Sequence, residues 1–110
     1  MNIENFIQDW VEATNTFNIK NYLDFYASDA ILDDPSVGKK FVGHEGIESY
    51  YTSYFIGYKT QTKLIKLIIN NDTAYMEVEF TGEFPGGKIG GMFDIIFKEG
   101  KIHRVKADLL

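Results

Sequence analysis

The hydrophobic pattern of this chain changes its period near the middle, and this change restricts the fold more than any other feature. Between residues 3 and 55 apolar residues recur at intervals of three and four, as on one face of a helix. From Lys59 onward they alternate with polar residues or form short runs between turn signals, as in strands. Helices followed by strands predict an α+β fold, with helices covering one face of a mainly antiparallel sheet.

Residue spacing predicts three helices in the first half of the chain. The first follows Asn2, a suitable N-cap, and carries an apolar stripe over residues 3–14. The second follows Asn18 and is expected to end near residues 28–29. The third is expected over residues 44–55.

Short strands are predicted over residues 30–34, 63–69, 74–81, 89–97 and 102–109. Turn signals separate the later ones, at Asn70-Asn71-Asp72, Pro85-Gly86-Gly87 and Glu99-Gly100. Gly90 and Gly91 would permit a bulge in a curved sheet, although a loose loop explains them equally well. We expect one domain, residues 1–110, in which a curved sheet wraps around the helices as a cone with an open end.

The composition argues against several kinds of chemistry. The chain has no cysteine and two histidines far apart in sequence, so we expect neither a metal nor another cofactor.

A net charge of −5 makes nucleic acid an unexpected partner. No apolar run approaches the ~20 residues that span a bilayer, and the start MNIENFIQDW lacks the basic flank of a secretory signal. We therefore expect no membrane partner and a cytoplasmic location.

Two adjacent carboxylates, Asp33 and Asp34, end a short apolar run directly before Pro35. Proline restricts the preceding residue to extended conformations, so Asp34 is expected to close a strand opposite an aromatic helix face, where it could transfer protons. The alternative is an ordinary turn aspartate that accepts hydrogen bonds from backbone amides. Asp33 is expected to face the other way. Lys39 and Lys40 would attract an anionic ligand, or would simply be solvated.

These residues resemble the ketosteroid isomerase and SnoaL-like branch of the nuclear transport factor 2-like superfamily. The most specific part of the resemblance lies between Trp10 and Tyr51 and comprises the DA-x-x-x-DP turn at Asp29 to Pro35, Gly43, Ile47 and Tyr50-Tyr51. An EGKI turn at Glu99 to Ile102 extends it. The resemblance implies a cone of three helices and a curved sheet around an apolar pocket, and it implies that Asp34 is a general base that moves a proton between two carbons beside a carbonyl.

The resemblance also bears on the groups that would stabilise the oxyanion. The family's principal donor, a tyrosine, is matched here by Trp10, whose indole is a far weaker acid. Two supporting tyrosines are matched by Tyr26 and Tyr51. A second donor, a protonated aspartic acid, is matched by Phe93, and the adjacent Asp94 would reach the pocket only through a bulge that shifts the strand register.

The sequence leaves two classes of function open. In the first, the protein is an isomerase, cyclase or hydratase of an apolar carbonyl compound, although not a true steroid isomerase. In the second, it is a non-catalytic ligand-binding or dimerisation module. The candidate catalytic residues are Asp34 and Asp94, and the candidate ligand-binding residues are Trp10, Tyr26, Tyr51, Phe55 and Phe93. A homodimer that forms through the outer face of the sheet, frequent in the resembled superfamily, is expected.

Overall fold

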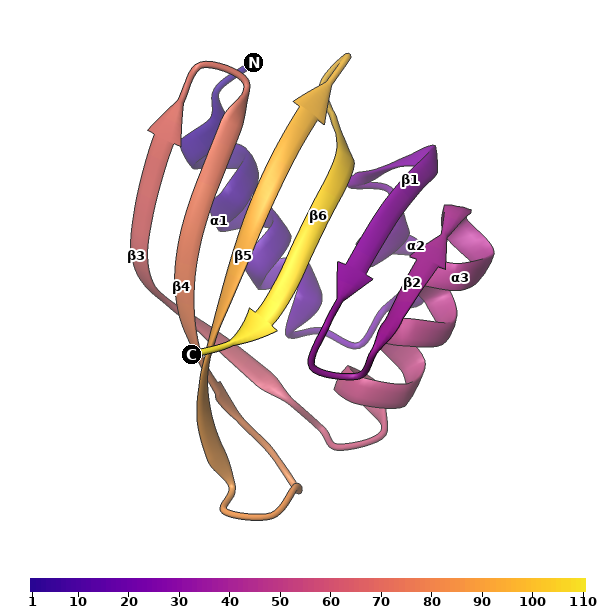
Figure 1. Ribbon diagram of the computed structural model, residues 1–110, viewed down its shortest axis with the longest axis vertical. Helices are drawn as coiled ribbons and strands as arrows, with labels where there is room; N and C mark the ends of the chain where they lie inside the picture. Colours follow the sequence, from indigo (N-terminus) through magenta and orange to yellow (C-terminus); the bar gives the residue numbers. More distant parts are fainter.

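A curved six-stranded sheet with helices on its inner face makes up the computed structural model, which describes residues 1–110 (Figure 1). The elements are α1 (Ile3–Thr14), α2 (Ile19–Leu23), β1 (Tyr26–Asp34), β2 (Lys39–Val42), α3 (Gly43–Tyr51), the π-helical turn η1 (Thr52–Ile56), β3 (Gln61–Asn70), β4 (Thr73–Thr81), β5 (Lys88–Lys98) and β6 (Lys101–Leu109). The strand order is β2-β1-β6-β5-β4-β3, and only β1 and β6 are parallel. The predicted α+β class is confirmed.

The first two helices begin where the sequence predicts. The side chain of Asn2 accepts a hydrogen bond from the Asn5 amide, and that of Asn18 accepts one from the Asn21 amide, each at 3.0 Å. The second helix is shorter than expected, because α2 ends at Leu23.

Pairing with a distant strand explains why α2 stops early. Tyr26 already belongs to β1 and lies opposite Ile102 of β6, whose amide donates to the Phe25 carbonyl at 2.9 Å. The predicted helical extension to residues 28–29 is therefore wrong. Hydrogen bonding to a strand about 76 positions later in the chain overrides a local spacing that suits a helix.

Strand β2 is absent from the sequence prediction. Its residues pair antiparallel with β1, so that Asp34 lies opposite Lys39. A tight turn joins the two strands, with the Val37 amide donating to the Asp34 carbonyl at 3.2 Å and Gly38 at a φ of 70°. The turn fixes the backbone of Asp34 at the end of the strand pair.

The third helix changes its winding near its C-terminus. Regular α-helix ends at Tyr51, and the next turn is π-helical, with the Gly57 amide donating to the Thr52 carbonyl at 2.9 Å. The Thr60 amide donates to the Phe55 carbonyl, also five residues back, at 2.8 Å. Each such bond adds one residue to the turn and so rotates the following side chains about the helix axis.

Strand β5 is regular where the sequence allows a bulge. Its register with β4 is continuous from Thr73 opposite Ile96 to Thr81 opposite Lys88, so the bulge that Gly90-Gly91 would permit is not present. A loose loop, the alternative explanation of these glycines, is not present either, because both pair with β4. The register of the sheet shifts elsewhere, between Tyr26 and Ile31, between Leu64 and Lys66 and between Ile96 and Phe97.

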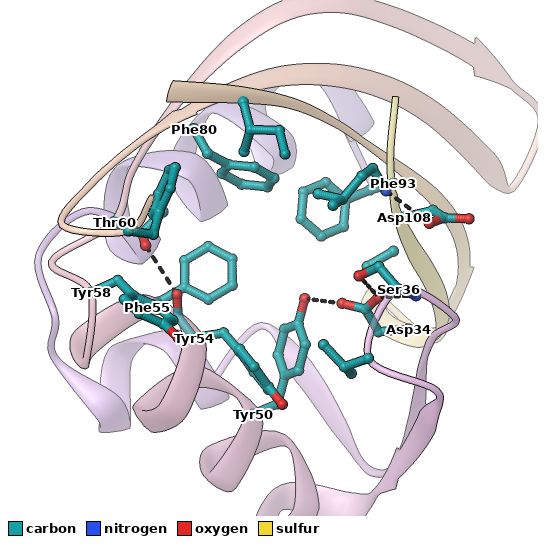
Figure 2. Close-up of a pocket in the computed structure, with 15 residues that line it drawn as sticks. Asp34, Ser36, Tyr50, Tyr54, Phe55, Tyr58, Thr60, Phe80, Phe93 and Asp108 are labelled. Atoms are coloured by element: carbon teal, nitrogen blue, oxygen red, sulfur yellow. Dashed lines mark hydrogen bonds between the residues drawn. The ribbon is translucent and has the colours of Figure 1, made fainter. Parts of the chain in front are cut away.

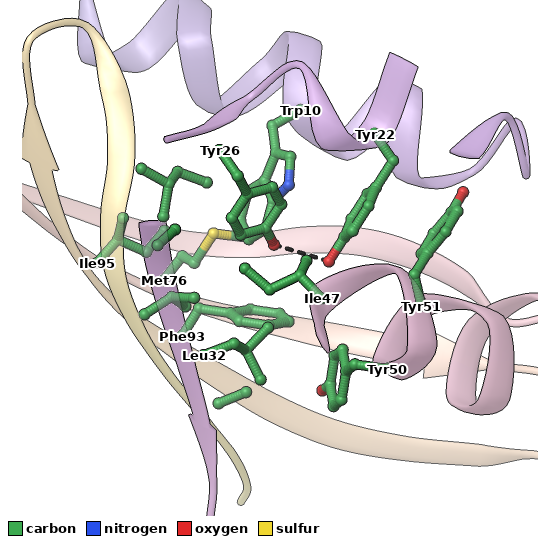
Figure 3. Packing of buried hydrophobic residues seen from close by; sticks show 14 of the residues in the cluster. Trp10, Tyr22, Tyr26, Leu32, Ile47, Tyr50, Tyr51, Met76, Phe93 and Ile95 are labelled. Carbon is green, nitrogen blue, oxygen red and sulfur yellow. Dashed lines mark hydrogen bonds between the residues drawn. The ribbon is translucent and has the colours of Figure 1, made fainter. Parts of the chain in front are cut away.

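The core between helices and sheet is rich in tyrosine (Figure 3). Tyr22 stacks on Tyr51 with ring centroids 3.8 Å apart, and its hydroxyl shares a hydrogen bond of 2.7 Å with that of Tyr26. The Tyr51 hydroxyl donates to the Thr14 carbonyl at 2.8 Å. These contacts tie α1, α2, β1 and α3 together. No helix of the structure has the length and apolar character needed to cross a bilayer.

Candidate functional site

A cavity of about 270 Å³ lies between α3, η1 and the inner face of the sheet (Figure 2). Fifteen residues line it, and eleven of them are hydrophobic. Its aromatic members are Tyr50, Tyr54, Phe55, Tyr58, Phe80, Phe84 and Phe93. A pocket of this size with a few polar groups on an apolar wall is typical of a small-molecule site.

Asp34 is the buried acid of this cavity, with 6% of its surface exposed. Its Oδ2 accepts a hydrogen bond from the Tyr50 hydroxyl at 2.8 Å (Figure 2). Its Oδ1 accepts two bonds from Ser36, from the backbone amide at 2.9 Å and from the hydroxyl at 2.5 Å. The aspartate thus has both features considered from the sequence: it is an acceptor in the turn before Ser36, and it lies on the cavity wall.

Tyr50 reaches this carboxylate from the opposite wall. It lies on α3 among aromatic rings, with centroids 4.9 Å from Phe41 and 5.8 Å from Phe55. Burial, followed by the charge of Asp34, raises the pKa of Tyr50 well above its ordinary value. The hydroxyl therefore keeps its proton at neutral pH and uses it to donate a hydrogen bond to Asp34.

The regular register of β5 determines which of its residues reach the cavity. Phe93 is buried and lines it, whereas Asp94 is exposed on the outer face of the sheet, directly opposite Lys106. The bulge that would turn Asp94 inward does not form, so Asp94 and Asp34 do not share a cavity. Asp33 faces outward as expected, beside Asp94 and Lys106.

Three of the candidate ligand-binding residues lie behind the cavity wall. Trp10 is 2% exposed and packs against Phe93 with centroids 5.3 Å apart, and its Nε1 has no hydrogen-bond partner. Tyr26 packs against Trp10 at 6.2 Å, and the Tyr51 hydroxyl is bonded to the backbone of α1. None of the three lines the cavity, whereas Phe55 and Phe93 do.

The structure adds site residues that the sequence prediction lacks. Tyr50 lies on α3 and Tyr54, four residues later, on η1, so their helical spacing was a usable signal. Phe80 lies on the mainly apolar face of β4, as its alternation indicates. Asp108 and Ser36 have no comparable signal, because their position at the cavity depends on how the ends of β6 and β1 meet.

The structure contains no group of three or more histidine, aspartate or glutamate side chains that could hold a metal ion. The His44 side chain is hydrogen-bonded to the backbone of β1: its Nε2 lies 2.8 Å from the Tyr26 carbonyl oxygen. His103 lies in β6, where it is half-buried. The two histidines therefore do not contribute to the cavity.

The fold and the site together define a cone-shaped α+β domain with an aromatic pocket and one buried acid. The sequence profile of the SnoaL-like domain matches residues 7–105. The chain belongs to the SnoaL-like family. A search of curated proteins found no significant match.

Solved structures show the same fold at low sequence identity. A candidate polyketide cyclase from Sinorhizobium meliloti is 17% identical, with a TM-score of 0.85 over 94% of this chain and 93% of that one. A candidate ketosteroid isomerase from Kribbella flavida is 15% identical, with a TM-score of 0.83 over 96% and 75%. A protein with a ketosteroid isomerase-like fold from Catenulispora acidiphila, in complex with trimethylamine, is 15% identical, with a TM-score of 0.82 over 93% and 82%. The predicted family and the cone-shaped fold are confirmed.

Proposed function

We propose that the cavity binds an apolar small molecule and that Asp34 acts on it as a general base. The observation that carries this proposal is the position of the Asp34 carboxylate, buried on the wall of an aromatic cavity, with hydrogen bonds from uncharged groups only. A carboxylate shielded from water and held in one orientation is suited to proton abstraction from carbon.

The proposed reaction moves a proton within an apolar carbonyl compound. Asp34 takes a proton from the carbon next to the carbonyl, and the electron pair of the broken C–H bond shifts toward the carbonyl oxygen to give an enolate. Asp34 then returns the proton to another carbon for an isomerisation. For a cyclisation, the enolate carbon bonds to the carbon of a second carbonyl, whose oxygen becomes an alkoxide and takes the proton back from Asp34. Tyr50 keeps the carboxylate in place through its hydrogen bond.

A specific observation favours a second function, ligand binding without catalysis. An enolate needs a hydrogen-bond donor at its oxygen, and losing one such donor typically costs about 10²–10³ in rate. Trp10 lies behind Phe93, and Asp94 lies on the other side of the sheet, so neither supplies this donor. The hydroxyls of Tyr50 and Ser36 already donate to Asp34.

Deuterium exchange into a neutral ketone separates the two functions. We expect the protein to accelerate exchange of the α-hydrogens of 2-tetralone in D₂O, followed by NMR. Asp34→Asn should abolish the acceleration while 2-tetralone still binds, and Asp94→Asn, which removes a carboxylate from the outer face, should change neither.

Two outcomes contradict catalysis by Asp34. Unchanged exchange in Asp34→Asn excludes it as the base. Binding of 2-tetralone by the wild-type protein without any accelerated exchange supports the binding module instead.

We further propose a homodimer that forms through the outer face of the sheet. This face exposes Ile68 and Ile96, at 49% and 45%, among charged residues such as Asp94 and Arg104. Apolar side chains of this size on a sheet face are suited to an interface. Ile96→Lys should favour the monomer in sedimentation experiments at micromolar concentration, and a wild-type protein that sediments only as a 12.6 kDa species would refute the dimer.

A further inference from the structure

The cavity contains one negative and no positive side chain. Its acid is Asp34, and no lysine, arginine or histidine lines it. Asp108 borders the cavity with its backbone, but it lies opposite Met92, so its side chain is on the outer face of the sheet, like that of Lys106 (Figure 2). Asp34 receives hydrogen bonds from the uncharged Ser36 and Tyr50. The Asp34 carboxylate has no cationic partner within the protein.

The nearby lysines are engaged elsewhere. Lys59 pairs with Glu83 at 3.2 Å on the surface, and Lys88 lies 3.5 Å from Glu79. The ammonium group of Lys39 lies 5.1 Å from the centre of the Phe41 ring, outside the cavity. The sequence-based expectation that Lys39 and Lys40 attract an anionic ligand therefore finds no support at this site. An anion in the cavity would meet a buried carboxylate without a compensating cation.

The rest of the wall is a continuous set of aromatic rings. Tyr50 lies 5.4 Å from Tyr54 and 5.8 Å from Phe55, Phe55 lies 5.7 Å from Phe80, and Phe80 lies 6.0 Å from Phe93. Figure 2 shows the rings of Phe55 and Phe80 across the hollow from Asp34. The face of an aromatic ring carries negative electrostatic potential and attracts a cation within about 6 Å of its centre.

We propose that the ligand of this cavity carries a single positively charged amine or ammonium group on an apolar skeleton. The inference rests on the proposed binding function and specifies its ligand class. The aromatic wall accommodates the apolar skeleton and attracts the cation, and the buried carboxylate of Asp34 supplies the opposite charge. Because the cavity is mostly apolar, these interactions are less weakened by water than on an open surface.

Three soluble compounds of nearly the same shape test the charge of the ligand. Choline is cationic, 3,3-dimethyl-1-butanol is its neutral isostere, and 3,3-dimethylbutanoate is anionic. In NMR titrations of the wild-type protein we expect choline to bind about tenfold or more tightly than the alcohol, as expected for a partly desolvated cation–π contact. The anion should not bind measurably.

Charge-neutralising variants assign the preference to the cavity. Asp34→Asn, which neutralises the carboxylate on the cavity wall, should weaken choline binding severalfold and leave the neutral alcohol unaffected. Asp94→Asn removes the same charge from the outer face of the sheet and should leave choline binding unchanged. Equal loss of choline binding in the two variants would show a general charge effect and would overturn the proposal.

The outcomes also separate this inference from the proposed function. If the alcohol binds as tightly as choline, the cavity is a small-molecule site but the cationic ligand class is wrong. If 2-tetralone and all three isosteres fail to bind, the binding function itself is wrong, and the ligand class with it.

Discussion

At the scale of single residues, the site depends on how one carboxylate is held. Asp34 accepts three hydrogen bonds, and two of them come from Ser36, only two positions away in the chain. Tyr50 supplies the third, from another element. The Tyr50 bond is therefore the one that fixes the carboxylate relative to the cavity wall rather than relative to its own turn.

Tyr50→Phe tests this bond. The substitution removes the hydroxyl and leaves one oxygen of a buried carboxylate without its donor, which should lower the free energy of unfolding by about 1–3 kcal/mol in urea titrations. Tyr54→Phe, the same change at a cavity residue that does not contact Asp34, should have a much smaller effect. Equal effects of the two substitutions would contradict a specific role of the Tyr50 bond.

At the scale of elements, the shape of the cavity depends on how closely β4 and β5 pack their inner faces. A Cβ atom at Gly91 would lie 2.4 Å from the ring of Phe80, which lines the cavity. Gly90 lies on the other face of the strand. A Cβ atom there would lie 3.4 Å from the side chain of Leu110, which is an ordinary van der Waals distance. Gly91 therefore leaves room for the Phe80 ring, and this is the structural role of one of the two glycines that the sequence suggested for a bulge.

Gly91→Ala should push the Phe80 ring toward the cavity. We expect the free energy of unfolding to fall by about 1–3 kcal/mol, as for other overpacked sites, and the binding of choline and of its neutral isostere to weaken together, because the volume is reduced for both. Gly90→Ala is the matched control and should retain both stability and binding. Unfolding and NMR titrations that do not distinguish the two variants would refute this role of Gly91.

At the scale of the whole molecule, buried tyrosines join the helices to the sheet and make stability sensitive to alkali. Burial raises the pKa of Tyr22, Tyr26 and Tyr50 well above the ordinary value, and it raises that of Tyr51 to about 12. In the unfolded chain these hydroxyls ionise near pH ~10. The folded protein therefore binds more protons than the unfolded one above that pH, and stability falls as pH rises.

The expected decline is steep. Each of the four buried tyrosines lowers the free energy of unfolding by about 1.4 kcal/mol per pH unit between its unfolded and its folded pKa, so the four together lower it by about 5 kcal/mol per unit between pH ~10 and ~11, whereas between pH 8 and 9 they change it little. Urea unfolding from pH 8 to 11 measures this slope. Tyr22→Phe should reduce it by about a quarter, and Tyr58→Phe, at an exposed residue, should not. Ionisation of the buried tyrosines near pH 10 in a protein that stays folded, followed at 295 nm, would contradict the prediction.

The sequence by itself determined the class of fold and the location of the acid. The period change predicts the α+β order, Asn2 and Asn18 mark helix starts, and the Asp34-Pro35 pair places a carboxylate at a strand end. These features are local: a cap, a spacing or a proline acts on its immediate neighbours and operates in any surroundings.

The tertiary structure decided what local rules leave open. The second helix gives way at Tyr26 because β6 pairs there, and the register of β5 places Phe93 inside and Asp94 outside because no bulge forms. The Tyr50–Asp34 bond and the position of Asp108 arise only when α3, β1 and β6 meet. Strand partners and registers depend on contacts between residues far apart in the chain, and one register step moves a side chain to the opposite face, so these features followed from packing and not from local pattern.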